Sequence, residues 1–195
     1  MIQNTTEIKA IVFDCFGVLV PDFNKQLLAS ATYSARTVEH INELRRQTDL
    51  GEISDSKFRQ EFERITGIDY SLESRVKNAK KELNHKLLGL IKQLKPNYKI
   101  GMLSNATAPH LKAVIKACAL KDYFDLVLIS SKLGAVKPEP RIFEILVKKL
   151  RVKFNKTIFI DDTKENIKSA SALGIRGVLY TNPAKLKEDL RDLLI

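Results

Sequence analysis

The chain has 195 residues, of which 44% are hydrophobic and 29% are charged, and its formal net charge is +10. This length fits one domain, or a core domain with a small insertion, and the apolar content is sufficient for a hydrophobic core. No apolar run approaches a membrane span, because Asp14 interrupts the first run and Ser104 interrupts a later one. Residues 1–7 lack an apolar signal-peptide core, so we expect a cytoplasmic protein with no membrane partner.

The basic residues and the cysteines argue against further classes of protein. Lysines such as Lys77 and Lys80 follow amphipathic helical patterns and are not interleaved with aromatic residues, which disfavours a nucleic-acid partner. Cys15 and Cys118 have neither paired spacing nor a histidine cluster nearby, which disfavours a disulfide framework and a structural zinc site. Cys15 is expected to be a small buried residue that points away from its neighbour Asp14.

The first apolar run, residues 8–20, predicts a buried β-strand that brings one carboxylate, Asp14, to a glycine-containing turn. A single aspartate at the end of a strand is most often a turn former or a helix cap. A buried strand, however, has no need of an acid there. Asp14 is therefore a candidate catalytic residue whose assignment depends on the rest of the chain.

Residues 21–80 follow a helical period instead of the two-residue period of a strand. Ser54 and Ser71 are candidate helix caps, and Gly67 ends the helix that Ser54 begins. A long amphipathic stretch through residues 83–94 then stops at a proline. Residues 21–80 are therefore predicted to form an all-helical block.

From residue 98 the chain alternates short apolar runs with helical patterns, which is typical of a parallel α/β sheet. The predicted strands span residues 99–103, 125–129, 157–160 and 176–180. The predicted helices span residues 108–117, 140–150, 164–173 and 183–193, the last with Asn182 as its cap. We therefore predict an α/β fold in which residues 1–20 and 81–195 form a Rossmann-like parallel-sheet core and residues 21–80 form a small inserted helical domain.

Polar side chains follow the predicted strands at one edge of this sheet. In open α/β sheets, ligands bind outside the carboxyl ends of the strands, so these side chains are expected to meet. They are Asp14, Ser104, Asn105, Lys137, Asp161 and Asp162. Each has a simpler explanation as a helix cap or a surface charge, but together on one edge they favour an active site.

The segments around these residues resemble the motifs of the haloacid dehalogenase superfamily, a group made up mostly of phosphate-ester hydrolases. Residues 13–19 resemble its first motif, residues 103–105 the second, Lys137-Pro138 the third, and residues 159–162 with Asn166 the fourth. The inserted helices resemble the small cap that one subfamily places between the first and second motifs. The resemblance covers nearly the whole chain and implies a sheet with the first strand at its centre and a cap that closes over the site.

The residue types suit attack by Asp14 on a phosphate monoester. A carboxylate that approaches a phosphate dianion meets a repulsion of about 4 kcal/mol for each like-charge pair at about 4 Å in an effective dielectric near 20, so counter-charge is required. Lys137 can supply one positive charge, and Mg²⁺ held by Asp14 with Asp161 or Asp162 can supply two. The backbone carbonyl of Phe16 is a further candidate metal ligand.

The remaining polar groups are expected to bind the phosphoryl group. Ser104, Asn105 and Lys137 are the candidates, because a hydroxyl, an amide and a cation can each bind a phosphoryl oxygen. The expected intermediate is an aspartyl phosphate on Asp14, which water then cleaves. The predicted substrate is a small phosphorylated metabolite, and the sequence predicts no particular oligomeric state.

Phe16 departs from the pattern that the resemblance implies. Phosphatases of the family usually carry a second aspartate two residues after the nucleophile, as general acid and base, and phenylalanine cannot transfer a proton. The loss of such a group typically costs about 10²- to 10⁴-fold in rate. The loss would be small for an activated phosphate, such as an anomeric sugar phosphate or an acyl phosphate, and large for an alkyl ester.

Two alternatives remain open at this point. The dehalogenases of the family also lack the second aspartate, so Phe16 is compatible with cleavage of a carbon–halogen bond. Against this, the adjacent carboxylates Asp161 and Asp162 beside Asp14 would repel one another unless a cation lay among them, and a dehalogenase needs no metal. The other alternative is a catalytically weak binding protein that keeps the fold. Asp22 is a weaker candidate, which would position the turn into the helical insertion or contact the substrate.

Overall fold

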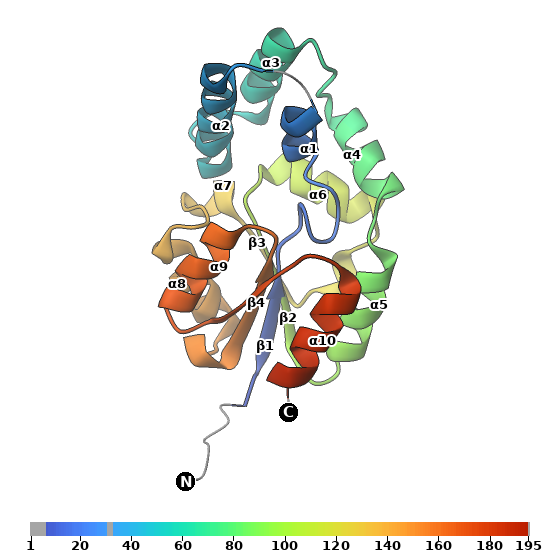
Figure 1. The fold of residues 1–195 in the computed structure, drawn as a ribbon, viewed down its shortest axis with the longest axis vertical. Coiled ribbons are helices and arrows are strands. Elements are labelled where there is room, and N and C mark those ends of the chain that lie inside the picture. Colours follow the sequence, from blue (N-terminus) through green and yellow to red (C-terminus); the bar gives the residue numbers. More distant parts are fainter. Residues whose placement is uncertain (1–6, 31–32, 195) are drawn as a thin grey trace.

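The computed structural model describes residues 7–30 and 33–194, and its centre is a five-stranded parallel sheet in the order β3-β2-β1-β4-β5 (Figure 1). The strands are β1 (Ala10–Phe13), β2 (Lys99–Ser104), β3 (Leu126–Ile129), β4 (Thr157–Asp161) and β5 (Arg176–Leu179). The predicted α/β fold with the first strand at the centre is thus confirmed. Residues 1–6 of the predicted core lie outside the described residues.

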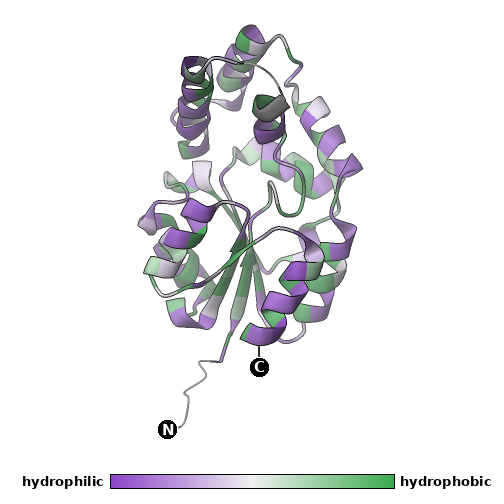
Figure 2. Cartoon of the chain, in the orientation of Figure 1, coloured by the Kyte–Doolittle hydropathy of each residue, from purple (hydrophilic) through white to green (hydrophobic). Residues whose placement is uncertain are grey.

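The central strand β1 is buried on both faces, as its unbroken apolar sequence predicts. Its side chains alternate, so that Ile11 and Phe13 join one hydrophobic cluster and Ala10 and Val12 join another. The first cluster includes residues of α5 (His85–Leu94), α6 (Ala108–Ala117) and α10 (Pro183–Leu193). The second includes residues of α8 (Pro140–Leu150) and α9 (Lys164–Ala172). Helices therefore cover both faces of an apolar sheet (Figure 2).

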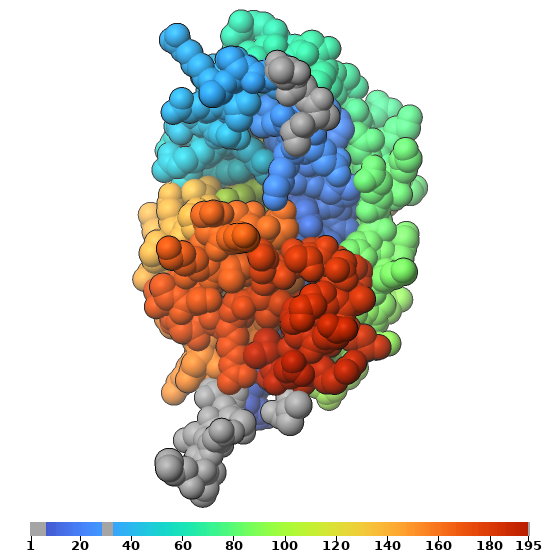
Figure 3. Space-filling model, in the orientation of Figure 1, coloured from blue at the N-terminus to red at the C-terminus, as the bar shows by residue number. Residues whose placement is uncertain are grey.

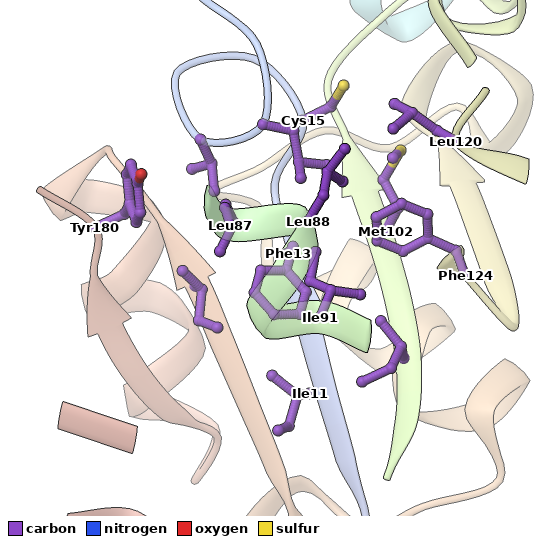
Figure 4. Close-up of a cluster of buried hydrophobic side chains, with 14 of the residues drawn as sticks. Ile11, Phe13, Cys15, Leu87, Leu88, Ile91, Met102, Leu120, Phe124 and Tyr180 are labelled. Carbon is purple, nitrogen blue, oxygen red and sulfur yellow. The ribbon is translucent and has the colours of Figure 1, made fainter. Parts of the chain in front are cut away.

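Cys15 continues the alternation of β1 into the first cluster, where it is fully buried near Phe13 and α5 (Figure 4). Burial raises the pKa of its thiol well above the ordinary value, and the charge of Asp14 adds to this effect. The prediction that Cys15 is a packing residue is confirmed.

Four helices between β1 and α5, which we call the cap helices, lie beyond the carboxyl ends of the strands (Figure 1). They are α1 (Phe23–Ser30), α2 (Ala35–Leu50), α3 (Asp55–Thr66) and α4 (Leu72–Lys81). Ser54 and Ser71 cap α3 and α4 as predicted, and Gly67 ends α3. The cap helices have a small apolar core of their own, built on Ile41, Phe58, Phe62 and Tyr70.

The amphipathic stretch through residues 83–94 forms a shorter helix than its length suggested. Asn84 caps α5 by accepting a hydrogen bond from the Leu87 N–H, so Leu83 lies between α4 and α5. A four-residue helix, α7 (Ser130–Leu133), follows β3 directly. No helix within the described part of the chain is long and apolar enough to cross a membrane.

Candidate active site

Asp14 lies at the point where β1 ends, buried at the carboxyl edge of the sheet. Its backbone N–H donates to the Ile160 carbonyl of β4, which extends the pairing of the two strands by one residue. The backbone N–H of Cys15 donates to Asp14 Oδ1 at 2.7 Å. The sheet and the following turn therefore fix the position of this carboxylate.

Lys137 lies between two carboxylates of neighbouring strands. Its Nζ is 2.8 Å from Asp14 Oδ1 and 2.7 Å from Asp161 Oδ2, and its side chain is 1% exposed. Burial alone would lower the pKa of this ammonium, but the two carboxylates raise it above the ordinary value. Lys137 is thus a buried, permanent positive charge. The simpler explanation considered from the sequence, that it is a charge on the protein surface, does not hold.

Asn105 holds the Lys137 backbone in place. Its Nδ2 donates to the Lys137 carbonyl at 2.9 Å, and its Oδ1 accepts from the Lys137 N–H, also at 2.9 Å. Asn105 is not the cap of α6, because Thr107 takes that position. The Asn105 side chain therefore positions the lysine. Its contact with the phosphoryl group stays a prediction, because both of these hydrogen bonds join Asn105 to the Lys137 backbone.

Asp161 is saturated with hydrogen bonds. Asn166 Nδ2 lies 3.0 Å from each carboxylate oxygen, and the Thr163 N–H donates to Oδ1 at 2.8 Å. Burial would raise the pKa of this acid, but Lys137 and these donors hold the pKa below its usual range. Asn166 belongs to the segment that resembles the fourth motif, but no role in the site was predicted for it. Its signal in the sequence is its position one helical turn after the acidic pair.

Burial raises the pKa of Asp14 well above its ordinary value, and the nearby charge of Asp161 acts in the same direction against the attraction of Lys137. The single positive charge of Lys137 is thus shared by the carboxylates of Asp14 and Asp161. A further positive charge in this site would favour the ionised form of Asp14, which is the form that can act as a nucleophile.

Asp162 lies beside the first turn of the chain after β1. Gly17 has a φ of +92°, and a Cβ at this residue would lie 2.6 Å from the Asp162 carboxyl carbon. Glycine is therefore required here for both its conformation and its size. On the other side, Nζ of Lys25 from α1 lies 2.7 Å from Asp162 Oδ2, which links a cap helix to the core. The space-filling view shows the cap, in blue and cyan, packed directly on the core, in yellow and orange (Figure 3).

The three carboxylates predicted to bind Mg²⁺ come together. Asp14, Asp161 and Asp162 each contribute a carboxylate oxygen, and these oxygens lie within 4.8 Å of one another. Three carboxylates face two ammonium groups, Lys137 and Lys25, so the cluster has one negative charge in excess. A set of carboxylate oxygens with excess negative charge fits a hard divalent cation.

Ser104 ends β2 next to this cluster and is fully buried. Its hydroxyl has no hydrogen-bond partner among the described residues. A buried hydroxyl without a partner is costly unless a ligand completes it. Its position at the carboxyl edge of the sheet suits a ligand bound beside Asp14.

Phe16 packs against a histidine of the core. Its ring is stacked on that of His110, with 4.8 Å between the centroids and 26° between the planes. Burial lowers the pKa of His110 to about 3, and the charge of Arg75 contributes to this effect. The imidazole is therefore neutral at physiological pH, so neither ring of this pair is a proton donor suited to catalysis.

Two cavities meet at Phe16. The larger, of about 900 Å³, is lined by Asp14, Lys137 and Asp162 of the core and by Arg45 and Asp49 of α2. The smaller, of about 50 Å³, is lined by residues of both the core and the cap helices. Arg45 and Asp49 were missed by sequence reasoning, because a charged residue in an amphipathic helix resembles a solvated one.

Asp22 lies on the cap side of both cavities. Arg45 Nη2 donates to its Oδ2 at 2.8 Å, and the Lys25 N–H donates to its Oδ1 at 3.1 Å. Burial would raise the pKa of Asp22, but Arg45 and the backbone donor hold it below the ordinary value. Asp22 therefore accepts hydrogen bonds at the start of α1, and of the two roles considered for it these bonds fit the positioning role.

Comparison with known proteins places these features in a family. A model of haloacid dehalogenase-like hydrolases matches residues 8–174. The chain is 28% identical to a D-ribitol-5-phosphate phosphatase of Bacteroides thetaiotaomicron, over 96% of this chain and 98% of that protein. It is 25% identical to an (S)-2-haloacid dehalogenase of Burkholderia cepacia, over 88% of this chain and 82% of the other.

A similar solved structure contains relevant ligands. The crystal structure of a family enzyme from Bacteroides thetaiotaomicron in complex with magnesium and inorganic phosphate superposes with a TM-score of 0.69. That comparison has 25% sequence identity and covers 89% of this chain and 94% of the other. The fold that surrounds the acidic cluster is therefore one that, in a relative, holds a metal ion and phosphate.

Proposed function

The chain belongs to the haloacid dehalogenase-like hydrolase family, and we propose that it is a Mg²⁺-dependent phosphatase that forms an aspartyl phosphate on Asp14. The observation that carries the proposal is the arrangement of Asp14, Lys137 and the acidic pair at one edge of the sheet. A buried nucleophile, a buried cation and an excess of carboxylate oxygens are the groups that phosphoryl transfer requires.

The side chains of this chain account for the chemistry at phosphorus. Asp14 attacks the phosphorus atom, the bond to the leaving oxygen breaks, and water later attacks the acyl phosphate to release phosphate and restore the carboxylate. Lys137 lies against Asp14 and stabilises charge on the phosphoryl oxygens. The buried Ser104 hydroxyl donates to one of these oxygens, which gives it the partner that it otherwise lacks.

For the metal, we assign Asp14, Asp162 and the Phe16 carbonyl as the direct ligands. Asp161 already accepts hydrogen bonds from Lys137, Asn166 and Thr163, so it holds the lysine and supplies negative charge beside the ion. When bound, Mg²⁺ neutralises charge on the phosphate and so permits the approach of an anionic nucleophile.

A dehalogenase function is the second candidate, because one relative is a haloacid dehalogenase. The electrostatics of the site favour the phosphatase. A dehalogenase has no use for a set of carboxylates whose charge exceeds that of the neighbouring lysines, and this cluster has that excess.

The substrate that we propose is a small phosphorylated metabolite. The larger cavity lies between the acidic cluster and α2, so its cap side would contact the leaving group. Residues 21–80 would act as the cap domain, and residues 1–20 and 81–195 as the catalytic core. A polyol phosphate is one candidate, because one relative is named a D-ribitol-5-phosphate phosphatase.

The test is hydrolysis of p-nitrophenyl phosphate and of alkyl phosphates with and without Mg²⁺. We expect excess EDTA to abolish turnover, and Asp14→Asn to lower it at least about 10⁴-fold with the fold intact, because an amide cannot form the acyl phosphate. Full turnover of the phosphate esters in EDTA would overturn the Mg²⁺ dependence, and halide release from 2-haloacids would support the dehalogenase. Inactivity with every phosphate ester would support the binding protein.

A further inference from the structure

Asp49 is an acid of the cap helices that faces the same cavity as Asp14 and Lys137. It lies in the last turn of α2, and its side chain is 12% exposed. It also lines the smaller cavity, as Phe16 does. Asp49 therefore borders the two cavities that the Phe16 ring, which stands in place of the usual acid, also borders.

The end of α2 is held against the core. Gly51, which ends α2 with a φ of +84°, approaches the core so closely that a Cβ there would lie 2.7 Å from the Ser131 carbonyl oxygen. Arg46 Nη2 lies 3.5 Å from Glu139 Oε1 at the start of α8, which adds an ion pair between the same two parts. The position of Asp49 relative to the site is therefore set by rigid elements.

The surroundings of Asp49 do not stabilise its charge well. An acid in the last turn of a helix opposes the helix dipole. Its nearest cation, Nε of Arg45, is 3.8 Å away, which is beyond hydrogen-bond distance, and the described residues donate no hydrogen bond to its carboxylate. A structural acid would be expected to have such donors, so this carboxyl group is available to a ligand.

The other titratable groups discussed at the boundary between the core and the cap helices, Asp22 and His110, are less suited to proton transfer. Arg45 and the Lys25 N–H hold Asp22 as a hydrogen-bonded carboxylate, and His110 is neutral with a pKa of about 3. Burial raises the pKa of Asp49 to about 6.

The charged groups that face Asp49 act in both directions. Arg45 of its own helix and Lys137 of the core lower its pKa, whereas Asp22 before α1 and Asp55 of α3 raise it. Burial prevails over the balance of these charges, so Asp49 exchanges its proton near neutral pH.

We propose that Asp49 is the general acid and base of the reaction, delivered from α2 in place of the acid that Phe16 replaces. This proposal rests on the phosphatase function proposed above. As Asp14 attacks phosphorus and the bond to the leaving oxygen breaks, the carboxylic acid of Asp49 gives its proton to that oxygen and an alcohol leaves. The Asp49 carboxylate then takes a proton from water, the oxygen of that water attacks phosphorus, and the bond from phosphorus to Asp14 breaks.

The proposal enlarges the class of substrates. With Phe16 and no other acid, the chain would be restricted to phosphates whose leaving groups depart without a proton. With Asp49 as the acid, it also hydrolyses alkyl phosphates such as those of polyols. The wild-type rate should therefore depend only weakly on the pKa of the leaving group. If no residue replaced the acid that is missing at Phe16, the rate should instead fall steeply as that pKa rises.

The test compares Asp49→Asn with the wild type on p-nitrophenyl phosphate and on ribitol 5-phosphate, with Mg²⁺ present. We expect the variant to lose about 10²-fold or more in kcat/KM with ribitol 5-phosphate and less than about 5-fold in kcat/KM with p-nitrophenyl phosphate, whose leaving group needs no proton. The comparison uses kcat/KM because this quantity reports the steps up to the departure of the leaving group, whereas kcat also contains the hydrolysis of the acyl phosphate, which is common to both substrates. The matched control is Glu43→Gln, the same change in an exposed acid of α2, which should leave both rates within about 2-fold of the wild type.

The activity with p-nitrophenyl phosphate shows in each preparation that the variant is folded. In the ratio of variant to wild-type kcat/KM for ribitol 5-phosphate, the titration of the substrate cancels. This ratio should be lowest below about pH 6, where wild-type Asp49 is protonated, and should rise above it. Equal losses of kcat/KM on the two substrates, or no loss of kcat/KM on either, would overturn the role of Asp49 while leaving the phosphatase function in place. A wild type inactive on both substrates would overturn both proposals.

Discussion

The core side of the active site and its cap side differ in how their polar groups are satisfied. On the core side, Lys137 binds Asp14 and Asp161, Asn166 and the Thr163 N–H complete Asp161, and Asn105 fixes the lysine backbone. These groups hold one another in place before any substrate binds. Such preorganisation is what stabilises charge in phosphoryl transfer without reorganisation during the reaction.

The cap side is incomplete by comparison. Asn24 Oδ1 and Arg75 Nε are buried without a hydrogen-bond partner among the described residues, and both residues line the smaller cavity. Asp49 accepts no hydrogen bond from the described part of the chain. The difference teaches that the groups that act on phosphorus are fixed by the protein, with the exception of the Ser104 hydroxyl, whereas the groups near the leaving group are left for a ligand to satisfy.

The largest effect should come from removing the cation that joins the core network. In Lys137→Ala, Asp14 and Asp161 would face each other without their shared ammonium, and the loss of one partner of a buried ion pair typically costs about 3–5 kcal/mol. We expect turnover of p-nitrophenyl phosphate to fall by about 10²- to 10³-fold, together with a clear loss of stability in urea.

Lys132→Ala is the matched control, because Lys132 is an exposed lysine of the short helix α7. It should change both quantities little. A Lys137→Ala variant as stable and as active as the control would show that the core network is not cooperative, and the contrast with the cap side would be lost.

A smaller effect should come from loosening the cap side at its attachment to the core. In Gly51→Ala the new Cβ would meet the Ser131 carbonyl oxygen at 2.7 Å, so the end of α2 must move. A shift of about 1 Å can cost up to about 10²-fold in rate, so we expect a loss of about 10-fold or more with ribitol 5-phosphate and a smaller loss with p-nitrophenyl phosphate.

Gly67→Ala separates this clash from backbone strain. Gly67 has a φ of +68° at the end of α3, and a Cβ there would have nothing within 4 Å. Both variants incur the cost of a left-handed alanine, about 1–2 kcal/mol of stability, but Gly67→Ala should keep full activity. Equal activities of the two variants would mean that the close approach of Gly51 does not position α2.

The fold was predictable from the sequence because two signals agreed. Apolar runs with β-branched residues alternate with capped helical patterns from Tyr98 onward, and this regularity specifies a parallel sheet. The ends of the predicted strands differ from the observed ones by about one residue, as at Ser104 of β2 and Asp161 of β4. These residues are buried, and their pairing with neighbouring strands carries each strand one residue further.

The core side of the site was predictable for the same reason. The carboxyl ends of parallel strands share one edge, so Asp14, Ser104, Lys137 and the acidic pair had to meet once the sheet was recognised. The hydrogen bonds of Asn105 were not predictable. They depend on the path of the loop before Pro138, which no periodic pattern describes.

The cap side was hardly predictable at all. Asp49 lies on an amphipathic helix whose charged residues are mostly exposed, and the sequence does not distinguish the one that turns toward the core. Its burial follows from the contact between Gly51 and Ser131, residues that are far apart in the chain. A tertiary contact of this kind determines which face of a helix meets the site.

The last expected effect leaves the chemistry aside, since it is on stability alone, and it compares the two acids of the cap side. The pKa of Asp49 is raised to about 6, so its contribution to stability is fully present below about pH 4 and is lost as the pH rises through about 6. An asparagine has no charge to bury, so Asp49→Asn should be more stable than the wild type at pH 8 by about 2–3 kcal/mol and nearly equal to it near pH 4. Asp22 has a lowered pKa, so its contribution is present above about pH 4 and is lost as the pH falls, and Asp22→Asn should instead be less stable at pH 8. Urea denaturation of both variants at pH 4 and pH 8 measures the two signs. If Asp49→Asn were also destabilised at pH 8, Asp49 would be a structural partner of Arg45, and the two acids would no longer differ in the way that proton transfer requires.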